Sequence, residues 1–212
     1  QKLFKDFLSW RVHHLNDRSF VLILSIIIGF LSGVAAALLK VTVITIGETL
    51  FSFYSDSDTI LPLIIFPIIG IILTIVFLKY IIRDNVDHGV PRILYAISKL
   101  DGSMRYHKTF SSLIGGSLTG GFGGSVGLES PIISTGASIG SSIGQSLKLG
   151  YKHKTLLIGC GAAGAMASIF TTPIAAVIFA FEVLMLDLSA ASIIPILMAS
   201  VTGAVTTKLL TA

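Results

Sequence analysis

Long uncharged stretches separated by short polar connections dominate this sequence of 212 residues. Residues 19–39, 61–78 and 193–207 contain no Asp, Glu, Lys or Arg. The longer of these stretches match the roughly 20 apolar residues that a helix needs to cross a bilayer. They show no strand-like alternation of apolar and polar positions, and helices satisfy their own backbone hydrogen bonds in lipid. The pattern therefore predicts membrane helices in these three places, extending to residues 46, 82 and 210.

Three shorter apolar segments open with proline preceded by a residue suited to a helix cap. Gly89-Val90-Pro91 opens a segment of about ten residues, Ser130-Pro131 opens one of about sixteen, and Thr172-Pro173 opens one that ends near Leu186. Proline is tolerated in the first helical turn because its missing N–H is not needed there. The repeated device predicts discontinuous helices that begin inside the bilayer. Their unpaired amides and positive dipole ends would face an anion.

The composition excludes the ordinary soluble classes. Hydrophobic residues make up 53% of the chain and charged residues 12%, with a mean hydropathy of +0.89, whereas soluble domains carry about 25% charged residues. We therefore predict an all-α integral membrane protein, a multi-helix bundle with tilted and discontinuous helices. The net charge of +4 comes from short basic clusters between apolar segments, which favours contact with lipid headgroups over nucleic-acid binding.

Cysteine and metal chemistry have no place in this prediction. The one cysteine, Cys160, lies in the small-residue stretch GCGAAGA, so a single chain can form neither a disulfide nor a thiolate metal site. Close packing is the role expected for it. We expect no cofactor, no metal and no catalytic residue.

The charged residues indicate how the chain is oriented. Residues 1–18 mix Leu, Phe and Trp with Lys and Arg, a pattern typical of an amphipathic helix in the membrane interface, and residues 19–212 form the transmembrane domain. The predicted connection from Gly47 to Ile60 has acidic residues but no Lys or Arg, whereas residues 79–108 carry six basic ones. The positive-inside rule places this basic stretch and the N-terminus in the cytoplasm. We expect the membrane to be a bacterial inner membrane.

Small residues recur at helical spacing in two places. Because positions four apart share one helix face, such stripes let two helix backbones approach closely, and each predicts a close helix contact. The stripes are Gly29, Gly33 and Ala37, and Gly136, Gly140 and Gly144.

Glu129 is the most isolated ionisable residue of the chain. The segments on either side of it, 110–124 and 132–147, contain no charged residue, and Ser130-Pro131 follows it directly at a predicted helix start. An ionisable side chain inside a membrane is a functional hypothesis by default, because its desolvation is costly. The plainer alternative is a glutamate that only caps the amides of its neighbours.

At these residues the chain resembles the ClC family of chloride channels and proton-coupled chloride transporters. The family's glutamate signature is similar to Gly127-Leu128-Glu129-Ser130-Pro131, with serine replacing a glycine, and its first signature is similar to Asp87-His88-Gly89-Val90-Pro91, with histidine replacing a serine. The resemblance implies that Glu129 gates the anion pathway. The residues for which it implies anion binding are His88, Gly89, Val90, Gly127, Leu128 and Ser130, at helix starts marked by Pro91 and Pro131.

The function that the resemblance implies is chloride transport, with chloride, protons and the lipid bilayer as partners. Val183 stands where proton-coupled members often carry a second glutamate. This favours a passive, voltage-gated type of channel or weak proton coupling, with a proton-coupled antiporter as the alternative. The resemblance covers only the first of two inverted repeats, so a second repeat is needed to complete the pore. Residues 174–210 resemble the family's subunit interface, which implies a homodimer.

Two other classes stay open. Gly123-Gly124-Ser125-Val126-Gly127 matches the G-x-S-x-G pattern of serine hydrolases and would suggest an intramembrane protease. A nucleophilic serine needs a base within reach, and among the histidines only His88 could approach it. The second alternative is a non-conducting membrane subunit, because half a pore is present.

Overall fold

The computed structural model describes residues 17–54, 61–82, 89–125, 127–185 and 189–211. These ranges contain helices and connecting turns and no strand, which confirms the all-α class. The helices are α2 (Asp17–Tyr54), α3 (Leu61–Val76), the π-helix η1 (Phe77–Ile82), α4 (Val90–Lys99), α5 (Lys108–Gly121), α6 (Glu129–Ser146), α7 (Tyr151–Phe170), α8 (Pro173–Val183) and α9 (Ala190–Leu210).

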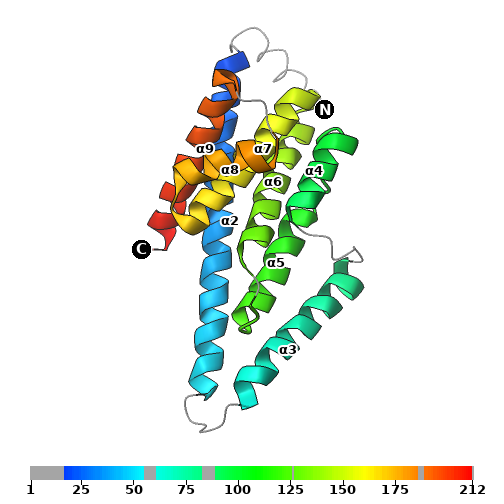
Figure 1. The fold of residues 1–212 in the computed structure, drawn as a ribbon, viewed down its shortest axis with the longest axis vertical. Coiled ribbons are helices and arrows are strands. Elements are labelled where there is room, and N and C mark those ends of the chain that lie inside the picture. The colour runs from blue at the N-terminus through cyan, green and yellow to red at the C-terminus, as the bar shows by residue number, and fades with distance from the viewer. Residues whose placement is uncertain (1–16, 55–60, 83–88, 126, 186–188, 212) are drawn as a thin grey trace, which may run out of the picture.

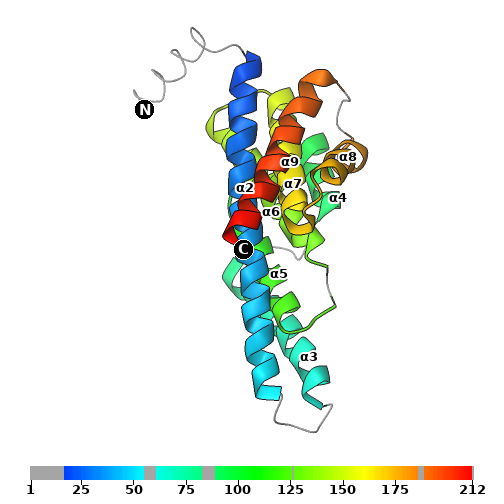
Figure 2. The same cartoon turned by 90° about the vertical axis from the view of Figure 1, so that its left-hand side faces the viewer.

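The helices form an elongated bundle along which α2 runs for most of the length (Figure 1). α6, α7 and α9 pack around one half of α2, whereas α3 lies beside α5 toward the other end. The view turned by 90° shows α9 crossing α2 at an angle, with α8 on the far side of α9 (Figure 2). This arrangement confirms the prediction of tilted and discontinuous helices.

Two of the described helices are long and apolar enough to cross a membrane, over residues 17–50 and 190–210. Two shorter apolar helical segments cover residues 64–80 and 173–183. The helix predicted over 61–82 is present as α3 followed directly by η1.

α2 is longer than predicted. It continues through Gly47 to Tyr54 and has 38 residues, about 57 Å at 1.5 Å per residue, so the prediction of a connection from Gly47 is wrong. Polar residues end a hydrophobic run without breaking the backbone ladder. Within this extension the Thr49 hydroxyl donates to the Thr45 carbonyl oxygen at 2.6 Å. The helix predicted over 1–18 lies outside the described residues apart from its last two, which belong to α2.

The short helices begin close to where proline predicts. α4 has ten residues and carries proline in its first turn, and α8 begins at Pro173. α8 ends at Val183, before the predicted end near Leu186, because Met185 has a φ of 51° that a right-handed helix cannot contain. α6 begins at Glu129, one residue earlier than predicted, so its proline is the third helical residue.

Glycine contacts join the helices along both predicted stripes. An added Cβ on Gly33 of α2 would lie 2.7 Å from the carbonyl oxygen of Gly203 in α9. Gly136 of α6 faces Gly161 of α7, and a Cβ on either would collide with the carbonyl oxygen of the other. The structure therefore confirms the close helix contacts predicted from the spacing of small residues.

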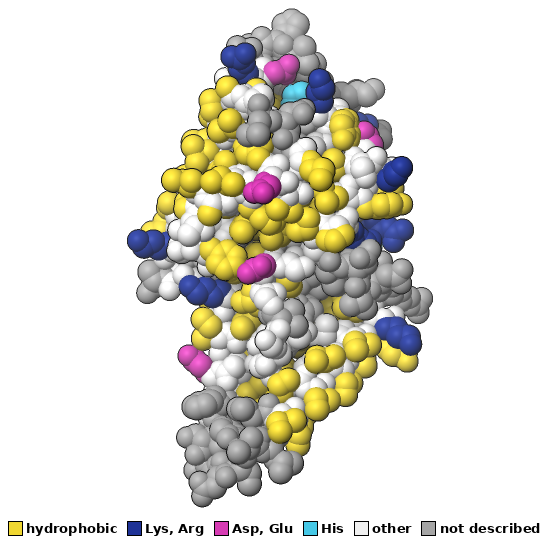
Figure 3. Space-filling model, in the orientation of Figure 1, with side chains coloured by type: hydrophobic (Ala, Val, Ile, Leu, Met, Phe, Trp, Pro, Cys, Tyr) yellow, Lys and Arg dark blue, Asp and Glu magenta, His cyan; other side chains and the backbone are white. Residues whose placement is uncertain are grey.

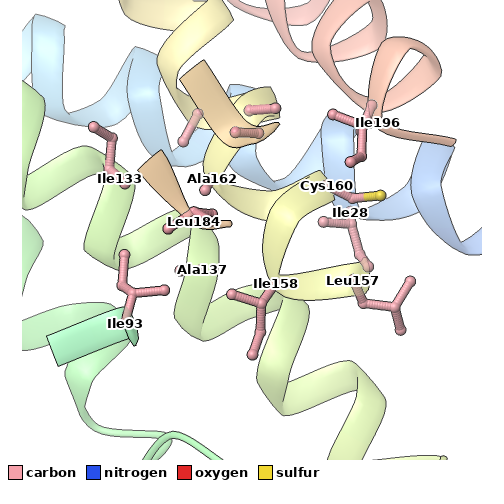
Figure 4. Packing of buried hydrophobic residues seen from close by; sticks show 14 of the residues in the cluster. Ile28, Ile93, Ile133, Ala137, Leu157, Ile158, Cys160, Ala162, Leu184 and Ile196 are labelled. Atoms are coloured by element: carbon pink, nitrogen blue, oxygen red, sulfur yellow. The ribbon is translucent and has the colours of Figure 1, made fainter. Parts of the chain in front are cut away.

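The core lies where α2, α6, α7 and α9 meet (Figure 4). Ile28, Leu157, Cys160 and Ile196 belong to this cluster and are completely buried. Cys160 is a free cysteine and packs among apolar neighbours, as predicted.

Candidate anion site

The start of α4 is shaped by glycine and proline. Gly89, the N-cap, has φ 97° and ψ −165°, a conformation that residues with a Cβ rarely adopt. Gly89 is buried, Val90 is half-buried and Pro91 is exposed. The first amides of a helix have no partner inside it, so those of Gly89 and Val90 remain available at this end of α4.

The start of α6 offers two more amides. Its first backbone bond runs from the Ile132 N–H to the Leu128 carbonyl oxygen at 3.2 Å, and Pro131 has no N–H. Glu129 and Ser130 therefore supply the free donors, and neither has a hydrogen-bond partner among the described residues. The carboxylate of Glu129 likewise makes no hydrogen bond there. The alternative in which Glu129 only caps its neighbours gains no support from this arrangement.

The two helix starts lie against each other. A Cβ on Gly89 would be 2.5 Å from Oγ of Ser130 and 3.6 Å from its Cβ. α5 supports α6 from behind, since a Cβ on Gly116 would be 2.7 Å from Cβ of Pro131. The fold thus joins two short motifs that are far apart in the sequence.

Glu129 lies at this meeting point with no ion-pair partner among the described residues. It is exposed, and an added Cβ on Gly127 would be 3.9 Å from both Cγ and Cδ of its side chain. Figure 3 shows isolated Asp and Glu side chains in the middle of a largely hydrophobic and uncharged face, with Lys and Arg toward its edges. As the first residue of α6, Glu129 lies at the end of the helix that carries the partial positive charge of the helix dipole.

The structure brings most of the predicted anion-binding positions to one place. His88 lies outside the described residues, and Gly127 belongs to the loop that leads into α6. Their roles as ligands stay predictions. The positions gathered at the two helix starts are Gly89, Val90, Pro91, Leu128, Ser130 and Pro131.

Among the described residues Ser125 is not paired with a histidine base, so the hydrolase alternative gains no support. Ser125 is exposed in the loop between α5 and α6 and makes no hydrogen bond to a histidine among the described residues. Nor do those residues contain a group of three or more His, Cys, Asp or Glu side chains that could hold a metal ion.

Sequence reasoning misses a row of polar side chains on α6. Ser134, Ser138 and Ser141 are completely buried, and Gln145 is half-buried. Their spacing of three or four residues is a signal that could have been found. It is hidden because the row overlaps the glycine stripe of the same helix.

Comparisons with known proteins extend this description. The sequence profile of the family described as voltage gated chloride channel matches residues 70–212. The chain is 26% identical over 141 residues to a protein of Ralstonia nicotianae that is named a ClcB-like chloride channel protein. The match covers 65% of this chain and 33% of that protein. It is 25% identical over 179 residues to an uncharacterized protein of Methanocaldococcus jannaschii, covering 84% of this chain and 41% of that protein.

Two solved structures share the fold. A slow cyanobacterial Cl−/H+ antiporter superposes with a TM-score of 0.78 at 24% identity, covering 93% of this chain and 48% of that one. A CLC-type fluoride/proton antiporter superposes with a TM-score of 0.72 at 28% identity, covering 91% of this chain and 47% of that one. This chain spans less than half the length of each of these proteins. The match over residues 70–212 and the shared helical fold lead to one conclusion, that the chain belongs to the voltage-gated chloride channel family, the ClC family of membrane proteins.

Proposed function

We propose that this chain forms half of an anion pathway across the membrane, with chloride as the transported ion and Glu129 as the gate. The observation that carries the proposal is the contact between the starts of α4 and α6, where Gly89 meets Ser130 and Glu129 begins the second helix. Membership of the chloride channel family supports chloride as the ion.

Two helix starts directed at one place can bind an anion without a fixed positive charge. Each helix start carries the equivalent of roughly half a positive charge and stabilises a nearby anion by about 0.3–1 kcal/mol. The free amides of Gly89, Val90, Glu129 and Ser130 would replace part of the hydration shell of the ion. Conduction needs binding that is weak enough to permit release, and amides meet this requirement better than a lysine would.

The Glu129 carboxylate suits a gate because it can compete with chloride for the same amides. When ionised, the carboxylate is itself an anion at a helix start. When protonated, it loses this attraction and leaves the position to chloride. We therefore expect chloride flux to rise as the pH falls.

The proposed transport is passive or weakly coupled to protons. Val183, at the end of α8, is half-buried, and the neighbouring Glu182 is exposed. The alternative is a proton-coupled antiporter, which is favoured by the solved structures of similar fold, both named as antiporters.

The decisive experiment replaces Glu129 by Gln, which mimics the protonated carboxylate. In vesicles that contain the complete assembly, E129Q should remove the pH dependence of chloride efflux, because the gate can no longer ionise. E182Q is the matched control, since it changes an exposed glutamate on α8 and should keep the wild-type pH profile.

Proton and chloride fluxes recorded together separate the alternatives. Chloride efflux without proton movement supports passive transport. Proton uptake at a fixed ratio to chloride that is lost in E129Q establishes proton-coupled antiport. An unchanged pH profile in E129Q contradicts the gate. A complete absence of chloride flux favours the non-conducting subunit.

The complete assembly in this proposal is a homodimer through residues 174–210, with a second repeat that closes each pore. α8 and α9 expose large apolar side chains, with Ile174 73%, Ile178 58% and Leu209 77% exposed. We propose that these face a second copy, in a bacterial inner membrane with the N-terminus in the cytoplasm. Replacing Ile174 and Ile178 by Trp should shift the mass of the purified protein from dimer to monomer. The same change at the exposed Ile68 and Ile72 of α3 should leave the dimer intact, and equal masses for both variants contradict this interface.

A further inference from the structure

The turn after α4 is folded tightly enough to present its backbone groups to α6. Asp101 and Gly102 have successive positive φ values of 51° and 69°. The amides of Leu100 and Gly102 both donate to the carbonyl oxygen of Ala96, at 3.2 Å and 2.9 Å. The chain therefore reverses directly at the end of α4 and runs on past α6.

Ser141 of α6 binds this turn through one buried hydroxyl. Its Oγ donates to the carbonyl oxygen of Gly102 at 2.7 Å and accepts from the N–H of Met104 at 2.9 Å. Gln145, one helical turn later, donates through Nε2 to the carbonyl oxygen of Met104 at 2.8 Å and to Oγ of Ser141 at 2.9 Å. Because a hydroxyl has one donor and two acceptor positions, every position on Ser141 is in use.

Lys154 of α7 holds the same turn from another side. Its Nζ donates to the carbonyl oxygen of Asp101 at 3.0 Å and pairs with the Asp101 carboxylate at 2.8 Å. An added Cβ on Gly102 would lie 3.1 Å from Cβ of Lys154, so the turn and α7 are in close contact. We refer to Ser141, Gln145 and Lys154, together with the turn that they bind, as the polar latch.

The polar latch and the anion site lie at opposite ends of one helix pair. α4 has ten residues, about 15 Å in length, and the eleven steps along α6 from Ser130 to Ser141 span a similar distance of about 16 Å. α4 is therefore held against α6 at its start, where Gly89 meets Ser130, and again just after its end. Between the two contacts its Ile93 side chain is completely buried in the shared core. A short helix fixed at both ends has little freedom to slide or tilt.

We infer that Ser141 and Gln145 are positioning residues for anion binding, because they fix the end of α4 and thereby the distance between its first amides and those of α6. The inference rests on the proposed function. Binding sites hold their ligand groups to within roughly 0.5 Å of the working geometry. Without the Ser141 hydroxyl, the Gly102 carbonyl and the Met104 N–H would be left buried and unpaired. The turn would then shift to reach water, and α4 would shift with it.

Ser141→Ala and Ser138→Ala form a matched pair that tests the inference. Ser138 is equally buried on the same helix, but among the described residues its hydroxyl makes a single, weak hydrogen bond, to the sulfur of Met104 at 4.0 Å. Each variant is purified from membranes as the assembly that it forms there. Its chloride dissociation constant is measured by calorimetry, and its melting temperature is measured separately in chloride-free buffer. S141A should raise the dissociation constant about three- to thirtyfold over S138A, with a parallel rise in the chloride concentration for half-maximal flux.

The possible outcomes separate positioning from stability. A lower melting temperature in S141A with a wild-type chloride dissociation constant would make the polar latch purely structural and overturn the inference. If S141A does not fold, Gln145→Leu removes the two amide bonds at a half-buried site and keeps the Ser141 hydroxyl. A weaker chloride affinity in Q145L supports the inference, and an unchanged one overturns it. Absence of chloride binding in the wild-type protein rejects the proposed function, and the inference with it.

Discussion

The interface between α6 and α7 and the meeting point of α4 with α6 use glycine for opposite purposes. At Gly136 and Gly161, which are both buried, the missing Cβ lets two backbones touch. At Gly89 the missing Cβ permits a φ of 97° and leaves room beside Ser130, at a helix start whose first amides have no partner within the helix. One contact stabilises the bundle, and the other keeps backbone donors available. Abundant glycine in a membrane chain therefore does not carry one meaning.

The largest expected effect on stability comes from filling the buried interface. A Cβ at Gly136 would collide with the carbonyl oxygen of Gly161 and lie 2.6 Å from Cβ of Ala165. Since backbone cannot move aside easily, Gly136→Ala should lower the free energy of unfolding by about 3 kcal/mol or more. Thermal unfolding in detergent measures this loss. Gly150→Ala is the control, because an added Cβ at Gly150 meets nothing within 4 Å, and similar melting temperatures for the two variants would refute the contact.

A smaller loss of stability, with a larger loss of anion binding, is expected at the helix starts. Gly89→Ala forces a residue with a Cβ into a left-handed conformation, which costs about 1–3 kcal/mol, and places that Cβ 2.5 Å from Oγ of Ser130. The amides of α4 should then move away from α6. The free energy of chloride binding should therefore weaken by more than the free energy of unfolding falls. Wild-type chloride affinity in this variant would separate Gly89 from the anion site.

The smallest expected effect separates the two causes of the stability lost in Gly89→Ala, which are backbone strain and the collision with Ser130. Adding Ser130→Ala removes the Oγ and leaves a Cβ at the ordinary distance of 3.6 Å. The double variant should therefore recover the collision part, about 0.5–1 kcal/mol of coupling between the two sites, while the strain at position 89 remains. A double-mutant cycle of melting curves measures this coupling. Strictly additive losses would mean that the two helix starts do not touch.

Local chemistry made part of the fold predictable. The start of α4 follows from Gly89-Val90-Pro91 because proline suits only the first helical turn. The contact of Gly33 with α9 follows from four-residue spacing, since small residues on one face invite a second backbone. The end of α2 was missed because hydropathy reports the surrounding solvent, whereas helix continuation depends on backbone hydrogen bonds, and the helix continues through the polar residues to Tyr54.

The candidate site could be predicted residue by residue but not as an assembly. Glu129 stands out because it is an isolated charge in an uncharged stretch. That Ser130 would lie beside Gly89 depends on how α5 packs against Pro131 through Gly116, and this long-range packing leaves no local pattern. The polar latch could not be predicted for the same reason. Ser141 binds backbone groups of a distant turn, and such groups do not depend on which residues form the turn.

The reciprocal contact of Gly136 with Gly161 also bears on how such a sequence can diverge. Packed cores usually drift by paired exchanges, in which one side chain shrinks as its neighbour grows. Here each glycine faces the backbone carbonyl oxygen of the other, so shrinking a neighbouring side chain, such as that of Ala165 beside Gly136, would not remove the collision. A larger residue at either position collides with backbone, and changing both positions together does not remove the collision. We therefore expect these two positions to stay glycine in relatives that have changed most of their other residues.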